Sequence, residues 1–289
     1  KPDRGERGFM VEKIGTPSEL GAYLARAHRF AKSLERAGLD AASERFLLQE
    51  YVDEPGEFGV MWVKHPDEPA GRVTSIVQKE LLSVHGDGSS SLASLIAAGE
   101  RTRLHERMLR EQYADRLHDV VPPGKEVRLV EVGNHVRGAT FRDACDLIDP
   151  AITEAFAPLA GAIPGFHLGR FDVRCRDAAA LRTGDFRVVE VNGVNSEPAH
   201  IYDPGNSLGR AYRDLLAHWR TVERVARANR RRGCVPPGIR DLGRAIGRHG
   251  RRLRAARDIG GPGDGEHGEP GDGHGEPGDG HGEPGLDRA

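Results

Sequence analysis

The chain has 289 residues, of which 37% are hydrophobic and 30% are charged, a composition that allows one large or two small globular domains. A formal net charge of −2 gives no general attraction to a polyanion, so we expect no nucleic-acid partner. No apolar run approaches the roughly 20 residues that a membrane-spanning helix needs, and we expect no membrane partner.

Short strands and helices alternate along the predicted chain. Apolar patterns predict strands at 9–14, 46–52, 59–64, 73–82 and 127–132, and helices at 18–37, after the 86–91 loop, and at 150–163 and 208–230. Residues 171–173 and 188–192 predict two more strands, joined by a polar turn. Because the strands come in hairpins between helices, an α+β fold is favoured over a parallel, doubly wound sheet.

The C-terminal part of the sequence differs in composition. Twelve arginines lie between 224 and 257, and with Trp219 as the nearby aromatic we interpret them as a solvated helical surface rather than an RNA or membrane patch. The string GDGHGEP at 271–277 is repeated at 278–284, and this Gly/Pro/His tail is predicted to be disordered. Three cysteines without CxxC spacing are expected to be reduced, as in a cytoplasmic protein. They are Cys145, Cys175 and Cys234.

Three polar side chains fall on the last predicted strand pair. Glu190 and Asn192 lie two residues apart and so share one face of a strand, which Asp172 on the neighbouring strand can join. Two carboxylates and an amide oxygen suit Mg²⁺, which usually keeps phosphate oxygens and waters as its other ligands. The pattern suggests a metal–nucleotide site. The alternative is that the acids are solvated and that Asn192-Gly193 is a turn.

Other motifs suit a nucleotide. The string KPDRGERG at 1–8 is a glycine-containing turn whose Lys1 can contact phosphates. The strand end at 49–52 can face an adenine ring, and Glu57 beyond it can accept hydrogen bonds from ribose hydroxyls. Lys79 can neutralise phosphate charge. The serines of the loop after it either close over the nucleotide or cap the next helix.

The loop GNHVRG at 133–138 offers groups for a substrate. Asn134 and Arg137 suit recognition of a carboxylate. His135 could act as a general base, although a lone histidine on a loop more often does not.

The order of five motifs resembles the ATP-grasp superfamily over about residues 1–205. The motifs are KPxxGxxG, QEYV with its following glutamate, the lysine of KE, DVR and EVN. GDGSSSLASLI and GNHVRGA look most similar to the branch with D-alanine–D-alanine ligases, cyanophycin synthetases and glutamate–cysteine ligase-like enzymes. The resemblance implies two α+β subdomains that grip ATP. It also implies an ATP- and Mg²⁺-dependent (alternatively Mn²⁺-dependent) carboxylate–amine ligase that forms an amide through an acyl phosphate.

The resemblance further implies roles for individual residues. Lys1 and Lys79 would hold ATP phosphates, and Arg174 would stabilise the transferring phosphoryl group. The adenine and ribose would contact Gln49, Glu50, Tyr51, Val52 and Glu57. The Mg²⁺ ions would be bound by Asp172, Glu190 and Asn192. The substrates would contact Asn134, Arg137, Glu197 and His200, of which the last two alternatively cap the following helix.

The resemblance also predicts how the chain is organised. We expect a small ATP-grasp subdomain at 1–64, a large one with the metal site at 65–232, an Arg-rich helical extension at 233–258 and the disordered tail at 259–289. Because no strand precedes the first motif, an N-terminal domain of the family is expected to be missing. The expected partners are small carboxylate and amine substrates, amino-acid or peptide-like, and a second copy in a homodimer. Two alternatives stay open: a non-catalytic or truncated ATP-binding module, and an ATP-grasp phosphotransferase.

Overall fold

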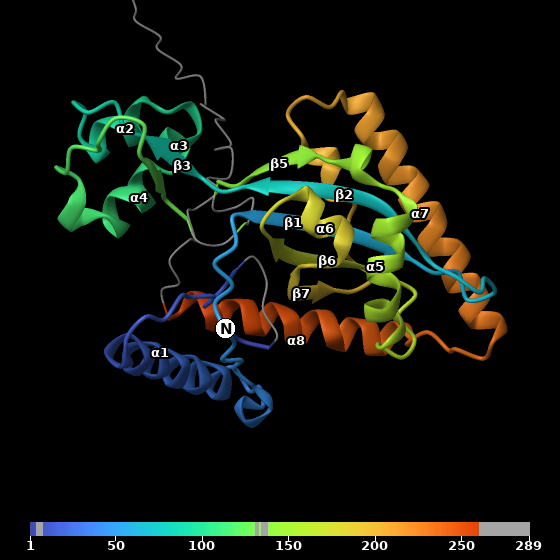
Figure 1. Cartoon of the computed structure of the whole chain (residues 1–289). Coiled ribbons are helices and arrows are strands. Elements are labelled where there is room, and N and C mark those ends of the chain that lie inside the picture. Colours follow the sequence, from blue (N-terminus) through green and yellow to red (C-terminus); the bar gives the residue numbers. More distant parts are fainter. Residues whose placement is uncertain (4–7, 131–132, 134–137, 260–289) are drawn as a thin grey trace, which may run out of the picture.

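The structure is a computed structural model that describes residues 1–3, 8–130, 133 and 138–259. Its centre is a five-stranded antiparallel sheet in the order β5-β2-β1-β6-β7 (Figure 1). These strands are β1 (Gly56–Val63), β2 (Arg72–Glu80), β5 (Thr140–Asp143), β6 (Leu168–Cys175) and β7 (Arg187–Asn192). A separate pair is formed by β3 (Ser83–His85) and β4 (Glu126–Arg128). The fold is therefore α+β with antiparallel sheets, as the sequence predicts.

The helices lie around these sheets, and local side chains explain where several of them begin. They are α1 (Pro17–Arg36), α2 (Leu92–Ala98), α3 (Glu100–Leu104), α4 (Glu106–Gln112), α5 (Pro150–Gly161), α6 (Ala178–Thr183), α7 (Leu208–Arg231) and α8 (Ile239–Arg257), with short 3-10 turns η1 (Ala41–Ser43), η2 (Ala114–Arg116), η4 (Cys145–Leu147) and η5 (Ala199–Tyr202). Thr16 and Glu19 form a capping box at the start of α1. Asp149 caps α5, because its carboxylate accepts the Ile152 N–H at 2.9 Å.

One face of the five-stranded sheet is apolar and is covered by α5 and α6 (Figure 1). Phe156 of α5 is fully buried there, with its ring centroid 5.6 Å from that of Phe171 on β6 and 4.6 Å from that of Phe186. Each such side chain stabilises the fold by about 1.5–3 kcal/mol through burial. The opposite face carries polar groups together with a smaller apolar cluster of Met61, Val63 and Leu168 against Val222 of α7.

Of the three smaller cores in the described residues, two lie beside the sheet. One joins β3 and β4 to α2 and α4. The other joins α1 to α8, which run side by side in Figure 1. In this second core Phe30 is fully buried, and Arg252 of α8 lies 5.3 Å from its ring centroid and pairs with Glu44. Part of the arginine-rich stretch therefore packs against the N-terminal region. None of the described helices is long and apolar enough to cross a membrane.

Several local predictions are wrong. Residues 9–14 and 46–52 form no strand, apart from a single bridge between Pro2 and Phe46. Phe9 and Phe46 pack instead against the α1–α8 core, which uses their apolar side chains without a ladder. β6 and β7 are joined through helix α6 and not through a simple polar turn. The described part of the 127–132 prediction is strand only as far as Arg128, and the predicted tail beyond 259 lies outside the described residues.

Candidate functional site

The face of the sheet opposite α5 and α6 carries a row of charged side chains. Residues that pair directly across antiparallel strands project to the same face. Glu57 in the central strand β1 pairs with Lys79 of β2 on one side and with Arg174 of β6 on the other. Two residues before Arg174 on β6, Asp172 pairs with Glu190 of β7. The register of four strands therefore brings these residues together.

Glu57 is held by two cations. Lys79 Nζ lies 3.1 Å from its Oε1, and the Arg174 guanidinium binds its Oε2 through two nitrogens at 3.1 and 3.0 Å. Arg174 also donates to the Val52 carbonyl at 2.9 Å. These side chains are at most 10% exposed, so the charges interact with little screening by water. These contacts occupy three of the about four lone-pair positions of the Glu57 carboxylate, so at most one is left for a ribose hydroxyl.

Asp172 is the second anionic centre. Its carboxylate lies 3.2 Å from Lys79 Nζ, accepts two hydrogen bonds from Arg170 at 2.8 and 3.2 Å, and accepts one from Asn192 Nδ2 at 3.1 Å. Lys79 is thus shared by Asp172 and Glu57. We call the set Glu57, Lys79, Arg170, Asp172 and Arg174 the ion network.

The charges of the ion network hold one another ionised. Burial raises the pKa of Asp172, but Lys79 and Arg170 outweigh it, so the pKa lies below the usual value. Burial lowers the pKa of Lys79, yet the carboxylates of Asp172 and Glu57 leave it raised. In Arg170, the nearby carboxylates of Asp172 and Glu190 likewise overcome burial and raise the pKa. A buried, fully charged cluster is typical of functional sites, although structural networks also occur.

Gly59, which has no side chain, leaves room for the ion network. A Cβ at Gly59 would lie 2.8 Å from Val77 Cγ1 and 3.1 Å from both Arg170 Cδ and Asp172 Oδ1. Gly59 pairs with Asp172 across the β1–β6 ladder, so the guanidinium and carboxylate occupy the space above it. Gly133 approaches Glu57 in a similar way, because its Cβ would lie 2.3 Å from Oε1.

Two cavities adjoin the ion network. A cavity of about 730 Å³ lies between β2 and helices α2 and α3, and its lining includes Lys79, Arg101 and Arg128. Its volume falls in the range of small-molecule sites. A smaller cavity of about 190 Å³ is lined by Tyr51 and Arg174 among others. The residues predicted to face adenine therefore adjoin a different cavity from Lys79. Between the two cavities runs the chain of contacts from Arg174 through Glu57 to Lys79.

The predicted metal ligands lie together. Asp172 and Glu190 are direct cross-strand partners, and Asn192 contacts Asp172. Glu190 is exposed, and toward the described residues its carboxylate makes no hydrogen bond or salt bridge. The carboxylates of Asp172 and Glu190 are oxygen donors that suit a hard cation such as Mg²⁺ and fit the metal that the motifs imply, whereas Asn192 directs its amide N–H at Asp172. The cation would share Asp172 with Lys79 and Arg170.

The other predicted residues lie at varied distances from this face. Lys1 lies at the outer edge of the sheet, because its Nζ donates to the Val189 carbonyl of the edge strand β7 at 3.0 Å. Glu197 accepts from Tyr202 Oη and adds to the negative field at Arg170. His200 is buried in η5. Asn134, His135 and Arg137 lie outside the described residues, and Gln49 and Glu50 are exposed.

Two capping alternatives are settled by the helix starts. Ser91 caps α2, because its Oγ accepts the Ser94 N–H at 3.2 Å, so the capping interpretation of that loop is confirmed. Helix α7 is capped by Ser207 instead of Glu197 or His200, so the prediction that these two cap the following helix is wrong.

Arg170 is the residue of the ion network that the sequence analysis missed. It lies two positions before Asp172 on β6, and therefore on the same face of the strand. That spacing was the signal that could have found it. Arg174, the predicted phosphoryl-binding arginine, satisfies the same spacing on the other side of Asp172, and it is bound to Glu57.

The comparisons with known proteins give a distant likeness. No protein-family model and no curated protein matches the sequence. Among solved structures, a bifunctional glutathione synthetase from Pasteurella multocida is similar with a TM-score of 0.37 at 16% identity. The similarity covers 61% of this chain and 25% of that chain, so the chain spans about a quarter of that enzyme's length. A likeness at this TM-score establishes neither a shared fold nor a shared activity.

Proposed function

We propose that the chain is an ATP- and Mg²⁺-dependent carboxylate–amine ligase with an ATP-grasp fold. The observation that supports this most is the ion network, in which three cations and two buried carboxylates meet beside the exposed Glu190 on one sheet face. The motifs imply all of these residues except Arg170 from the sequence alone. Their close approach in space is an independent observation, because Glu57 and Arg174 are 117 positions apart.

Each residue has a proposed role that follows from its charge and position. Asp172, Glu190 and Asn192 hold Mg²⁺, which when bound neutralises phosphate charge. Lys79 and Arg170 stabilise the negative charge of the phosphoryl group, because phosphoryl transfer is catalysed mainly by positioning and electrostatics. Lys1 contributes further positive charge to the phosphates.

Arg174 acts through its neighbours in this proposal. Its guanidinium joins Glu57 to the Val52 carbonyl, and so it positions the 49–52 segment that the motifs assign to adenine. The same guanidinium lies over the Tyr51 ring, with Arg174 Cζ 5.6 Å from the ring centroid. This placement favours Arg170 over Arg174 for contact with the phosphoryl group.

The proposed reaction has two steps. A carboxylate oxygen of the acid attacks the γ-phosphorus of ATP, which breaks the bond to the β-phosphate oxygen and gives an acyl phosphate and ADP. The amine then attacks the acyl carbon, a C–N bond forms, inorganic phosphate leaves and the amine loses a proton. We expect no protein nucleophile to take part. The acid and amine are proposed to be small and amino-acid or peptide-like.

The test is calorimetric titration of ATP into the full chain with and without Mg²⁺. Glu190→Ala removes one proposed ligand from an exposed position, so the fold should survive while Mg²⁺-dependent affinity falls. Glu154→Ala is the matched control, because Glu154 is an exposed carboxylate on α5, on the other side of the sheet. Mg²⁺-independent or absent ATP binding in the folded protein, or equal affinity in both variants, would refute the proposed site.

Product analysis then separates the enzymatic alternatives. Amino-acid pairs are screened for ADP release, and the products are identified by mass spectrometry. An amide with ADP and phosphate supports the ligase, whereas a stable phosphorylated product supports a phosphotransferase. If the chain binds ATP but none of the amino-acid pairs gives ADP release, the result supports a non-catalytic binding module.

A further inference from the structure

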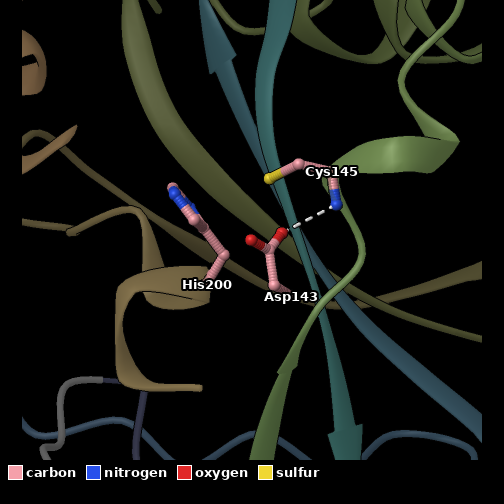
Figure 2. Close-up of side chains that lie close together, drawn as sticks. All are labelled: Asp143, Cys145 and His200. Atoms are coloured by element: carbon pink, nitrogen blue, oxygen red, sulfur yellow. Dashed lines mark hydrogen bonds between the residues drawn. The ribbon is translucent and has the colours of Figure 1, made fainter. Parts of the chain in front are cut away.

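A cluster of three potential metal ligands lies outside the ion network, at the edge of the five-stranded sheet. Asp143 ends β5, Cys145 begins η4, and His200 lies in η5. A carboxylate oxygen, the thiol sulfur and an imidazole nitrogen all lie within 4.8 Å of one another. Figure 2 shows the three side chains converging from their separate elements. None of the proposed ligase steps uses this cluster.

His200 is held as metal-bound histidines commonly are. Its Nε2 lies 3.3 Å from the Asp214 carboxylate of α7, and its Nδ1 lies 2.7 Å from Ser75 Oγ of β2. A carboxylate on the far ring nitrogen is the usual partner of a ligating histidine, since it fixes the tautomer and the ring orientation. The nitrogen left for a cation is Nδ1. Ser75 now contacts it, and the Cys145 thiol donates to the Ile76 carbonyl of β2 at 3.5 Å.

Asp143 is oriented by its own set of contacts. Its Oδ1 accepts the Cys145 N–H at 3.0 Å, and its Oδ2 accepts from Arg210 at 2.6 Å. Its backbone N–H donates to the Asp203 carboxylate at 2.6 Å, which fixes the end of β5. A carboxylate offers about four lone-pair positions, so these two hydrogen bonds orient the group and leave positions for a cation.

We propose that Asp143, Cys145 and His200 form a binding site for a divalent transition-metal ion of the Zn²⁺ class. Sulfur, nitrogen and oxygen donors together suit Zn²⁺, whereas Mg²⁺ takes oxygen ligands. Three protein ligands leave the fourth position of a tetrahedral site, beside the Ser75 hydroxyl. The ion joins β5 and η4 to η5, the turn that follows the strand with Asn192.

The competing explanation needs no ion. Ser75, His200 and Asp214 form a continuous hydrogen-bonded chain that by itself ties β2, η5 and α7 together. Buried polar groups are normally satisfied in this way. The two explanations differ in what they require of Cys145, since only a metal site uses its sulfur as a ligand.

The probe is Co²⁺ alone, added to the chelator-treated full chain. A cobalt–thiolate bond gives a charge-transfer absorption in the near ultraviolet that oxygen and nitrogen ligands do not give. We expect this absorption to saturate at one equivalent and to be removed by Zn²⁺. The Asp172 and Glu190 region offers oxygen ligands and no sulfur, so its occupation does not produce the signal, and excess Mg²⁺ should not compete.

Three variants locate the signal. Cys145→Ser should abolish it, and Cys234→Ser should retain it as the matched control, because Cys234 is an exposed thiol elsewhere. Asp214→Asn should weaken affinity by about 10–100-fold, as the loss of a partner of a ligating histidine does. Circular dichroism verifies that each variant is folded. No thiolate absorption in the folded wild-type chain, or absorption that survives Cys145→Ser, would overturn the site.

Discussion

Lys79→Met is the most direct test of the ion network. Lys79 Nζ lies 3.1 Å from Glu57 and 3.2 Å from Asp172, and its side chain is 6% exposed. Methionine retains an unbranched side chain of similar size, so the main change is the lost charge. Removing one partner of a buried ion pair costs about 3–5 kcal/mol. Because Glu57 keeps Arg174 and Asp172 keeps Arg170, we expect a loss near the lower limit, about 3 kcal/mol.

The assay is urea unfolding at neutral pH, followed by circular dichroism. Lys125→Met is the matched control, because Lys125 is exposed and its loss should change stability by no more than about 0.5 kcal/mol. A loss below about 1 kcal/mol in Lys79→Met, the range of exposed ion pairs, would show that the charges are solvated and that the reasoning from burial is wrong.

Two further predictions concern the same sheet face. The pKa of Asp172 is lowered in the folded chain, because Lys79 and Arg170 outweigh burial, so its contribution to stability is complete above the unfolded pKa of about 4 and disappears as the pH falls through the folded pKa. The free energy of unfolding, measured between neutral and acid pH, should therefore fall less steeply with falling pH in Asp172→Asn than in the wild-type chain. An equal slope in the two proteins would contradict this assignment. Gly59→Ala should destabilise the chain by about 1–3 kcal/mol, because its Cβ meets Val77 Cγ1 at 2.8 Å, whereas Gly21→Ala in α1, with no atom within 4 Å, should stabilise it by about 0.5–1 kcal/mol. The thermal midpoints of this pair should move in opposite directions.

The sequence could predict the parts of this site that depend on local periodicity. Glu190 and Asn192 share a face because they lie two apart in a strand, and the same rule placed Asp172 near them. Helix α1 was predictable from its spacing and from the cap before it. These features depend on residues within one element or its immediate neighbour.

The contacts between distant strands could not be predicted in this way. The pairing of Glu57 with Arg174 depends on the β1–β6 register, which is set by packing across the whole sheet. The cluster of Asp143, Cys145 and His200 has no spacing signal, because three separate elements supply its members. The prediction of a strand at 46–52 is wrong for a related reason. Phe46 packs into the α1–α8 core without pairing in a strand ladder.

A buried ion network is by itself weak evidence for a role in stability. Replacing a whole buried ion set by apolar side chains of similar volume is often neutral, or stabilising by about 1–4 kcal/mol, because the desolvation of every charge is avoided. The combined variant Glu57→Met, Lys79→Met and Arg174→Met should therefore be more stable than Lys79→Met alone. In the single variant, the buried carboxylates of Glu57 and Asp172 have both lost Lys79 as an ion-pair partner. Asp172 keeps Arg170 and Asn192 in both variants.

The comparison of these two variants separates folding from function. If the network exists to bind an anionic ligand, Mg²⁺-dependent ATP binding should be lost in both variants although the triple variant regains stability. A triple variant that is less stable than Lys79→Met would show that the charges are needed for the fold itself. In that case the ion network would be a structural element, and the exposed Glu190 alone would remain as a reason to place a cation on this face.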